Sequence, residues 1–397
     1  MTDASARRVV ILWRNLPHYR IQFYQQLRGV LRDSGVRLQL LVGRPSGSDL
    51  ARQDQATLEW EKRLDTRRIH LGESELLWQP AGGLVCASDL VIAEQGSKNL
   101  TNYWLHALRR AGAIRLAYWG HGVNLQARPE DIGRRVSEAL KRRLTREVDW
   151  WFAYTKHTAD LVAGSGFPRE RITDVQNSID TRRLRSDLAA VTEQDCTALR
   201  HKMGLHGEHV GLFMGGLYAD KNLPFLIAAA DEVRARVPGF HLCVAGDGEG
   251  AALVQAAARS RPWMHWVGAV FGREKAIQLR VSSVLMVPEG AGLVILDSFV
   301  AGVPLVVIQG AFHGPEMAYL ETGLNGLETE RGSSPSVYAE AVAALLLDPA
   351  RLARLRDRCT TSSNAYTIEN MVDRFSTGVL QALDVDGPAR RGERRGR

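Results

Sequence analysis

Short apolar runs recur along the first half of the chain, and between them apolar residues return every three or four positions. The runs predict buried strands, and the spaced positions predict amphipathic helices. The expected strands in this half are 9–13, 36–43, 89–93, 114–119 and 151–154. Apolar strands that alternate with helices indicate an α/β fold with a parallel sheet covered on both faces.

The alternation pauses near residues 177–180 and restarts at about residue 210. The expected strands are then 210–214, 240–245, 265–267, 284–288 and 304–308, and the expected helices are 223–237, 250–258 and 293–300. Two series of alternating strands and helices, of similar length, predict two doubly wound domains, 1–185 and 186–366. A helix over 367–385 is expected to pack back on the first domain, before a basic disordered tail, 386–397.

Length and composition suit a globular protein of two domains. No stretch approaches the ~20 consecutive apolar residues of a membrane span, and the N-terminus lacks the apolar core of a signal peptide. We therefore expect a cytoplasmic protein. The net charge is +7, but residues 387–397 hold five arginines and one glutamate, so +4 of it lies in the tail. The positive and negative charges of the remaining chain nearly balance, which argues against a nucleic-acid partner.

A basic amphipathic pattern covers residues 131–147, where six Arg and Lys residues flank an apolar stripe. Such a helix can lie on an anionic membrane surface. Acidic neighbours and the absence of aromatic anchors favour an ordinary surface helix instead. Peripheral contact with the inner face of a membrane stays open at this point.

The segment 287–297 carries the clearest candidate chemistry. A strand is expected to end at Pro288, and a helix is expected to begin near Gly292 after a glycine-bearing turn. Backbone N–H groups at a helix start can hold a diphosphate, and small residues let the backbone approach it closely. Glu289 could bind sugar hydroxyls and Asp297 ribose hydroxyls. The alternative is a buried strand and helix with two solvated carboxylates.

Glu289 and Asp297, with seven residues between them, resemble the E-x7-E motif of family 4 glycosyltransferases. The ending Ala-Gly-Val-Pro at 301–304 is similar to that family too, as are the glycine turns at 213–217, 244–248 and 266–268 and the loop 313–316. The resemblance implies a GT-B fold, with two Rossmann-like domains facing each other across a cleft. The first would be the acceptor-side domain and the second the nucleotide-sugar-binding domain. The family usually has a basic residue where this chain has Gly216, and a glutamate where it has Asp297.

The donor-binding residues that follow from the motif and the resemblance share a place at strand ends of the second domain. They are Gly215, Gly216, Lys221, Gly246, Gly268, Glu289, Gly290, Ala291, Gly292, Leu293, Asp297 and Glu316. In the first domain, His121 directly follows a strand, and the resemblance places a histidine near this position beside the donor sugar. Pro17, His18, Tyr19 and Arg20 follow the first strand and are predicted to face the acceptor. A lone histidine is more often structural, and 16–20 could be an ordinary strand–helix connection.

The predicted reaction moves a sugar from a nucleoside-diphosphate donor to a hydroxyl acceptor, with His121, Lys221 and Glu289 as catalytic residues. Lys221 and the helix start before residue 293 would stabilise charge on the departing phosphate. The resemblance implies retention of anomeric configuration, with no metal or other cofactor. The product would be a bacterial glycan, a glycolipid or a glycosylated metabolite. Two alternatives are a sugar-nucleotide epimerase of similar architecture and a non-catalytic nucleotide-sugar-binding subunit.

Overall fold

A computed structural model describes residues 6–45, 55–71, 74–122, 143–207 and 209–385 of the chain. The chain forms two compact units: unit 1 is Met1–Asn177 with Glu369–Arg397, and unit 2 is Ser178–Ile368. The tail 386–397 and most of the basic stretch 131–147 lie outside the described residues. Within the described ranges, no helix is long and apolar enough to cross a membrane.

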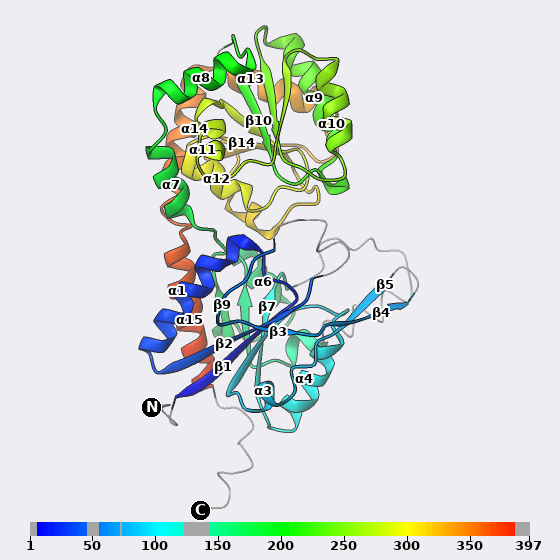
Figure 1. Cartoon of the computed structure of the whole chain (residues 1–397), viewed down its shortest axis with the longest axis vertical. Coiled ribbons are helices and arrows are strands. Elements are labelled where there is room, and N and C mark those ends of the chain that lie inside the picture. The colour runs from blue at the N-terminus through cyan, green and yellow to red at the C-terminus, as the bar shows by residue number, and fades with distance from the viewer. Residues whose placement is uncertain (1–5, 46–54, 72–73, 123–142, 208, 386–397) are drawn as a thin grey trace, which may run out of the picture. The chain divides into compact units, whose positions relative to one another are not determined.

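Unit 1 is built on a seven-stranded parallel sheet with the order β3-β2-β1-β6-β7-β8-β9 (Figure 1). Its strands are β1 (Arg7–Trp13), β2 (Val36–Gly43), β3 (Lys62–Leu64), β6 (Leu90–Glu94), β7 (Arg115–Gly120), β8 (Trp150–Ala153) and β9 (Ile172–Asp174). A separate antiparallel pair consists of β4 (Arg67–Leu71) and β5 (Ser74–Trp78). The helices of unit 1 are α1 (Ile21–Asp33), α3 (Gly82–Cys86), α4 (Leu100–Arg110), α6 (Lys156–Gly164) and α15 (Ile368–Asp384), with 3-10 turns η1 (His18–Arg20) and η2 (Arg169–Arg171).

The C-terminal helix α15 completes the core of unit 1, beside α1 (Figure 1). Phe375 of α15 is fully buried and stacks on Phe152 of β8, with ring centroids 4.3 Å apart. Its ring also lies 4.9 Å from Trp119 and 5.2 Å from Phe23. Buried aromatic rings contribute large apolar areas, so the last helix supplies part of this core.

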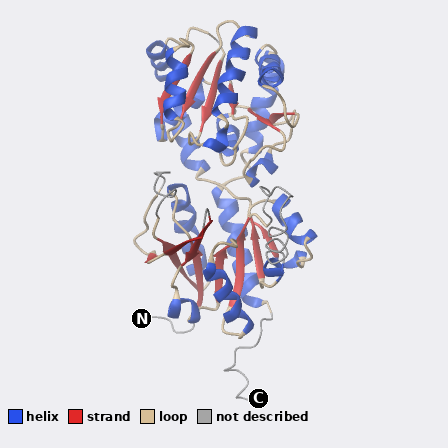
Figure 2. Ribbon diagram, turned by 90° about the vertical axis from the view of Figure 1, so that its right-hand side faces the viewer, coloured by secondary structure: helices blue, strands red, loops and turns tan. Residues whose placement is uncertain are grey.

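Unit 2 contains a six-stranded parallel sheet with the order β12-β11-β10-β13-β14-β15. Its strands are β10 (Val210–Met214), β11 (His241–Ala245), β12 (Met264–Gly268), β13 (Val284–Met286), β14 (Leu305–Ile308) and β15 (Gly326–Thr329). Its helices are α7 (Thr181–Ala189), α8 (Glu193–Met203), α9 (Leu223–Arg236), α10 (Ala251–Arg259), α11 (Gly272–Val281), α12 (Val294–Ala301), α13 (Pro335–Leu346) and α14 (Pro349–Ser362), with 3-10 turns η3 (Ala219–Lys221) and η4 (Pro315–Tyr319). Figure 2 shows helices on both faces of this sheet.

All ten predicted strands are confirmed, with ends that differ by at most two residues from the expected ones. The sequence missed both strands of the β4–β5 pair. It also missed β3, β9 and β15, which are three or four residues long. These three strands carry too few apolar residues to be recognised: β3 reads Lys-Arg-Leu, whereas the equally short β13 reads Val-Leu-Met and was predicted. They lie at the edges of their sheets, where only one neighbouring strand is needed.

Candidate functional site

The strand order of unit 2 reverses at the boundary between β10 and β13. From β10 the chain proceeds to β11 and β12 on one side, and from β13 to β14 and β15 on the other. In open parallel sheets, ligands bind beyond the carboxyl ends of the strands at such a reversal. The loops that follow these two strands, residues 215–222 (the β10 loop) and 287–293 (the β13 loop), therefore define the candidate site.

Side chains of the β10 loop contact the β13 loop directly. The Lys221 ammonium donates a hydrogen bond to the carbonyl of Gly290 and lies 3.4 Å from Asp220. Next to it, Asn222 Nδ2 donates to Glu289 Oε1 at 2.9 Å. A cation and a carboxylate that are 68 positions apart in the sequence thus belong to one cluster. Both side chains remain partly exposed, so this cluster can take up a ligand.

Asn222 is a member of the site that the sequence did not single out. Its φ is +46°, and it is the N-cap residue of α9, which has a proline in its first turn. Asparagine tolerates this left-handed conformation better than most residues, and proline suits a helix start. The sequence Asn222-Leu223-Pro224 carried that signal for the helix start, but the bond to Glu289 could not be read from it.

The β13 loop leads into α12 with unpaired backbone donors. Within the described residues, the N–H groups of Gly292, Leu293 and Val294 donate to no protein acceptor. Ala291 was predicted to help bind the diphosphate through its backbone. Its N–H is instead used within the protein, because it donates to His313 Nδ1 at 3.1 Å. His313 Nε2 in turn donates to the carbonyl of Ile308 at 2.8 Å. Burial lowers the pKa of His313, which favours this neutral, bridging form.

Three of the predicted glycines hold neighbouring strand ends together. Gly246 donates from its N–H to the carbonyl of Gly268 at 2.8 Å, and Gly215 donates to the carbonyl of Ala245 at 3.0 Å. Gly246 has a φ of +159°, and a Cβ there would collide with the carbonyl oxygen of Gly215. These residues therefore shape the edge of the sheet. By contrast, the N–H of Gly216 has no protein acceptor in the described part of the chain and is available to a ligand.

The predicted acidic residue Glu316 lies beneath the β13 loop. It is 4% exposed, and its Oε2 would be 3.6 Å from a Cβ built on Gly292. The loop that carries it is tied to the site, because Gly314 donates from its N–H to the carbonyl of Ala291 at 2.6 Å. Its carboxylate is therefore placed next to the start of α12.

Asp297 is buried and ion-paired, a contact that the sequence did not reveal. Its Oδ1 lies 2.6 Å from the ammonium of Lys275 on α11. The side chains are 9% and 23% exposed respectively. Lys275 therefore compensates the buried carboxylate and uses one of its two oxygens.

Replacing Lys275 with Met should lower the free energy of unfolding by about 1–2 kcal/mol, because Asp297 would be left buried without its cation. Lys156→Met is the matched control, since the Lys156–Asp160 pair is exposed. It should change stability by less than about 0.5 kcal/mol. Urea unfolding of both variants measures the difference, and equal effects would show that the Asp297 pair has no special importance.

Unit 1 has its own strand-order reversal, between β1 and β6. The predicted acceptor-side residues follow β1. His18 is exposed and Tyr19 partly exposed, whereas Pro17 and Arg20 are buried. Arg20 donates to Asn177 Oδ1 at 2.6 Å, and its guanidinium lies 5.2 Å from the centre of the Trp119 ring. Its charge is thus engaged inside unit 1, and the residues of this group that are open to a ligand are His18 and Tyr19.

His121 sits in a loop that Gln95 clamps. Gln95 Nε2 donates to the carbonyl of Gly122 at 2.8 Å, and Gln95 Oε1 accepts from the N–H of Gly122 at 2.9 Å. The His121 ring meets Tyr154 edge-on at 4.5 Å. His121 is exposed, and partial desolvation of its ring, followed by the charge of Arg20, lowers the pKa of the imidazole below its usual value. The imidazole is therefore neutral at pH 7.

Gln95→Ala removes both hydrogen bonds to Gly122 and should cost about 1–2 kcal/mol of stability. Gln25→Ala, at an exposed position of α1, is the control and should stay within about 0.5 kcal/mol of the parent. Thermal unfolding monitored by circular dichroism is the measurement. If Gln95→Ala were as stable as the control, the clamp would not be needed to hold the loop.

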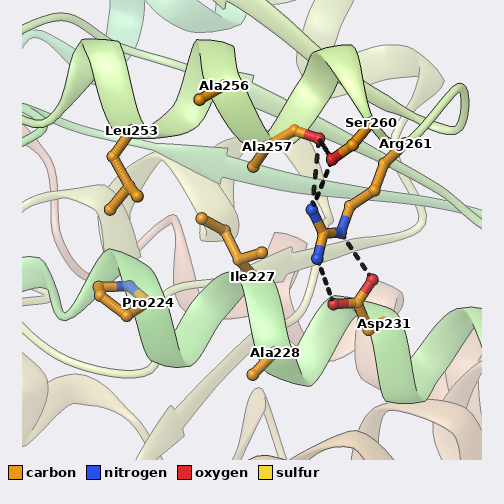
Figure 3. A pocket seen from close by; sticks show the side chains of 9 residues that line it. All are labelled: Pro224, Ile227, Ala228, Asp231, Leu253, Ala256, Ala257, Ser260 and Arg261. Carbon is orange, nitrogen blue, oxygen red and sulfur yellow. Dashed lines mark hydrogen bonds and ion pairs between the residues drawn. The ribbon is translucent and has the colours of Figure 1, made fainter.

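An apolar hollow of about 420 Å³ lies elsewhere in unit 2, between α9 and α10 (Figure 3). Its charged residues, Asp231 and Arg261, form a bidentate ion pair with distances of 2.7 and 2.8 Å. These charges neutralise each other, so the hollow offers no chemistry comparable to the two loops. The described residues contain no cluster of three or more His, Cys, Asp or Glu side chains that could hold a metal ion.

Comparisons with known proteins find a family match over part of the chain and several relatives. Residues 208–348 match the family of glycosyl transferases group 1. Over 266 residues the chain is 26% identical to the GDP-mannose-dependent alpha-(1-6)-phosphatidylinositol monomannoside mannosyltransferase of Mycolicibacterium smegmatis, covering 62% of this chain and 65% of that enzyme. It is 28% identical to the D-inositol 3-phosphate glycosyltransferase of Xylanimonas cellulosilytica, covering 67% of each.

Solved structures show the same fold. The crystal structure of HepE from Anabaena in complex with UDP superposes with a TM-score of 0.68 and 14% identity, over 94% of this chain and 100% of that one. At this identity the likeness concerns the fold alone: two parallel-sheet α/β domains of the GT-B type. The match to the mannosyltransferase extends over slightly less than two thirds of that enzyme's length.

Proposed function

We propose that this chain, whose residues 208–348 match the family of group 1 glycosyl transferases, transfers a glycosyl group from a nucleoside-diphosphate sugar to a hydroxyl acceptor. The observation that carries the proposal is the contact between the two loops at the strand-order reversal. It brings the Lys221 ammonium and the Glu289 carboxylate beside the unpaired N–H groups that open α12. The relatives named above are transferases, which favours transfer over epimerisation.

The chemistry separates the sugar's anomeric carbon from the oxygen of the β-phosphate. Negative charge grows on that oxygen while the sugar acquires oxocarbenium character. N–H groups at a helix start and an ammonium are suited to the growing charge. The acceptor hydroxyl bonds to the anomeric carbon, and its proton passes to the departing phosphate. Attack from the face that the phosphate leaves would retain the anomeric configuration, as the E-x7-E motif implies.

The remaining residues are proposed to bind the donor. Glu289 keeps one carboxylate oxygen beyond the bond to Asn222, and this oxygen can accept from a sugar hydroxyl. Asp297 Oδ2 is the corresponding candidate for a ribose hydroxyl, beside Lys275. His121 is proposed as a neutral partner for a sugar hydroxyl, as the family resemblance implies. No metal or other cofactor enters this scheme.

A thermal-shift screen of UDP-, GDP- and ADP-sugars tests donor binding. A ligand at 100 times its dissociation constant stabilises the folded state by about 2.7 kcal/mol, so a specific donor should raise the melting temperature by several degrees. Free sugars without a nucleotide are the control and should have little effect. A folded protein that none of the nucleotide sugars stabilises would contradict the proposal.

Peripheral membrane association is proposed separately, through the basic stretch 131–147. Each exposed Arg or Lys near an anionic surface contributes about 1 kcal/mol at low salt. Co-sedimentation with phosphatidylglycerol vesicles should therefore decrease as the salt concentration rises, whereas phosphatidylcholine vesicles should bind little. Equal sedimentation with both lipids would contradict electrostatic binding.

A further inference from the structure

Gly216 in the β10 loop lies beside a tyrosine ring. Its backbone is outside the left-handed region, so its φ does not demand glycine. The three atoms nearest to a Cβ built there all belong to Tyr218: Cε2, Cδ2 at 2.7 Å and Cζ at 3.1 Å. Real Cβ atoms essentially never come within 3.0 Å of another heavy atom, as this one would to Cε2 and Cδ2. The ring therefore occupies the space that a side chain at position 216 would need.

A second glycine borders the same ring. A Cβ built on Gly248, in the turn after β11, would lie 3.1 Å from Cε1 of Tyr218. The ring thus fits between two positions that lack side chains, at the ends of β10 and β11. Tyr218 also begins the turn that carries the cation, because its carbonyl accepts the N–H of Lys221 at 3.0 Å. A swing of the ring toward position 248 is restricted by this packing.

We infer that Tyr218 determines how the β10 loop binds a diphosphate, an inference that rests on the proposed function. Its ring takes the place of any charged side chain at 216. A diphosphate that binds to the loop can then contact three groups: the Lys221 ammonium, the N–H of Gly216 and the uncharged ring of Tyr218. A loop with one ammonium holds a nucleoside diphosphate less tightly than one with two cations, and its binding is less sensitive to salt.

The inference predicts that the effect of an added cation depends on the ring. Gly216→Arg alone must displace Tyr218 and should weaken the binding of UDP or GDP by about fivefold or more. In a Tyr218→Ala background, the same substitution has room and should strengthen binding by about fivefold or more. The gain should shrink as the salt concentration rises. Tyr218→Phe keeps the ring, so Gly216→Arg should again weaken binding in that background.

Titration calorimetry with UDP and with GDP measures these affinities in the full chain. Gly29→Arg adds the same charge on α1, where a side chain meets no atom within 4 Å, and should leave nucleotide affinity unchanged. A reversal of sign between the two backgrounds supports the inference. If Gly216→Arg changed affinity in the same direction with and without the ring, the inference would be overturned while nucleotide binding stood. If the parent protein bound neither these nucleotides nor any nucleotide sugar of the thermal-shift screen, the proposed function would fail as well.

Discussion

Lys221→Ala is expected to lower kcat by roughly 30- to 1000-fold, a loss of about 2–4 kcal/mol of transition-state stabilisation. The ammonium is a compact charge on the β10 loop, and its contact with the Gly290 carbonyl holds it against the middle of the β13 loop. The leaving phosphate carries more negative charge in the transition state than in the bound donor, so KM for the donor should change less than kcat. Steady-state kinetics with a nucleotide sugar and an acceptor are the measurement.

Lys202→Ala is the control, because Lys202 is exposed near the end of α8 and should not affect turnover. The chain contains only seven lysines, so single replacements of this kind are easy to interpret. EDTA should leave the activity of the parent protein largely intact. Near-normal turnover by a folded Lys221→Ala variant would remove this residue from catalysis, and strict dependence on a divalent metal would contradict the metal-free scheme.

Glu289→Gln should lower turnover by at least about tenfold, or roughly 1.4 kcal/mol, while the fold is kept. Glutamine has the same shape, and its Oε1 can still accept the hydrogen bond from Asn222. The substitution therefore removes the charge and leaves the contact between the loops in place. Kinetics should be compared with those of Glu249→Gln, whose Oε1 accepts the N–H of Ala219 in the same region. If both variants lost activity equally, a general loss of loop order would explain the effect better than the Glu289 charge.

The placement of Lys221 and Glu289 at the same edge of the sheet follows from features that a sequence displays. Each residue comes shortly after a predicted buried strand, and strands of a parallel sheet end at the same edge. The apolar runs were long enough to place β10 and β13 to within two residues. The helix start after residue 292 was also visible, because glycines precede it and an apolar helix follows.

Contacts made by single side chains across the fold could not be predicted in this way. His313 accepts a hydrogen bond from the N–H of Ala291, and Lys275 forms an ion pair with Asp297. The two residues of each pair are 22 positions apart in the sequence. Neither pair belongs to a periodic pattern. The slot for Tyr218 likewise depends on how closely the ends of β10 and β11 approach each other, which hydrophobic periodicity does not report. Arg20 is a cation in a loop after a strand, so the sequence suggested that it binds a ligand. Its guanidinium is instead buried beside Asn177, which comes 157 positions later in the chain.

Glycosyl transfer is observed by following donor and acceptor in the same reaction. The parent protein, a nucleotide sugar labelled in the sugar, and a lipid or metabolite extract should yield one nucleoside diphosphate for each labelled glycoside formed. We expect this glycoside to keep the anomeric configuration of the donor, and we expect Lys221→Ala to form it far more slowly. An isomerised nucleotide sugar that appears without any acceptor, or tight donor binding with no turnover in any extract, would contradict glycosyl transfer.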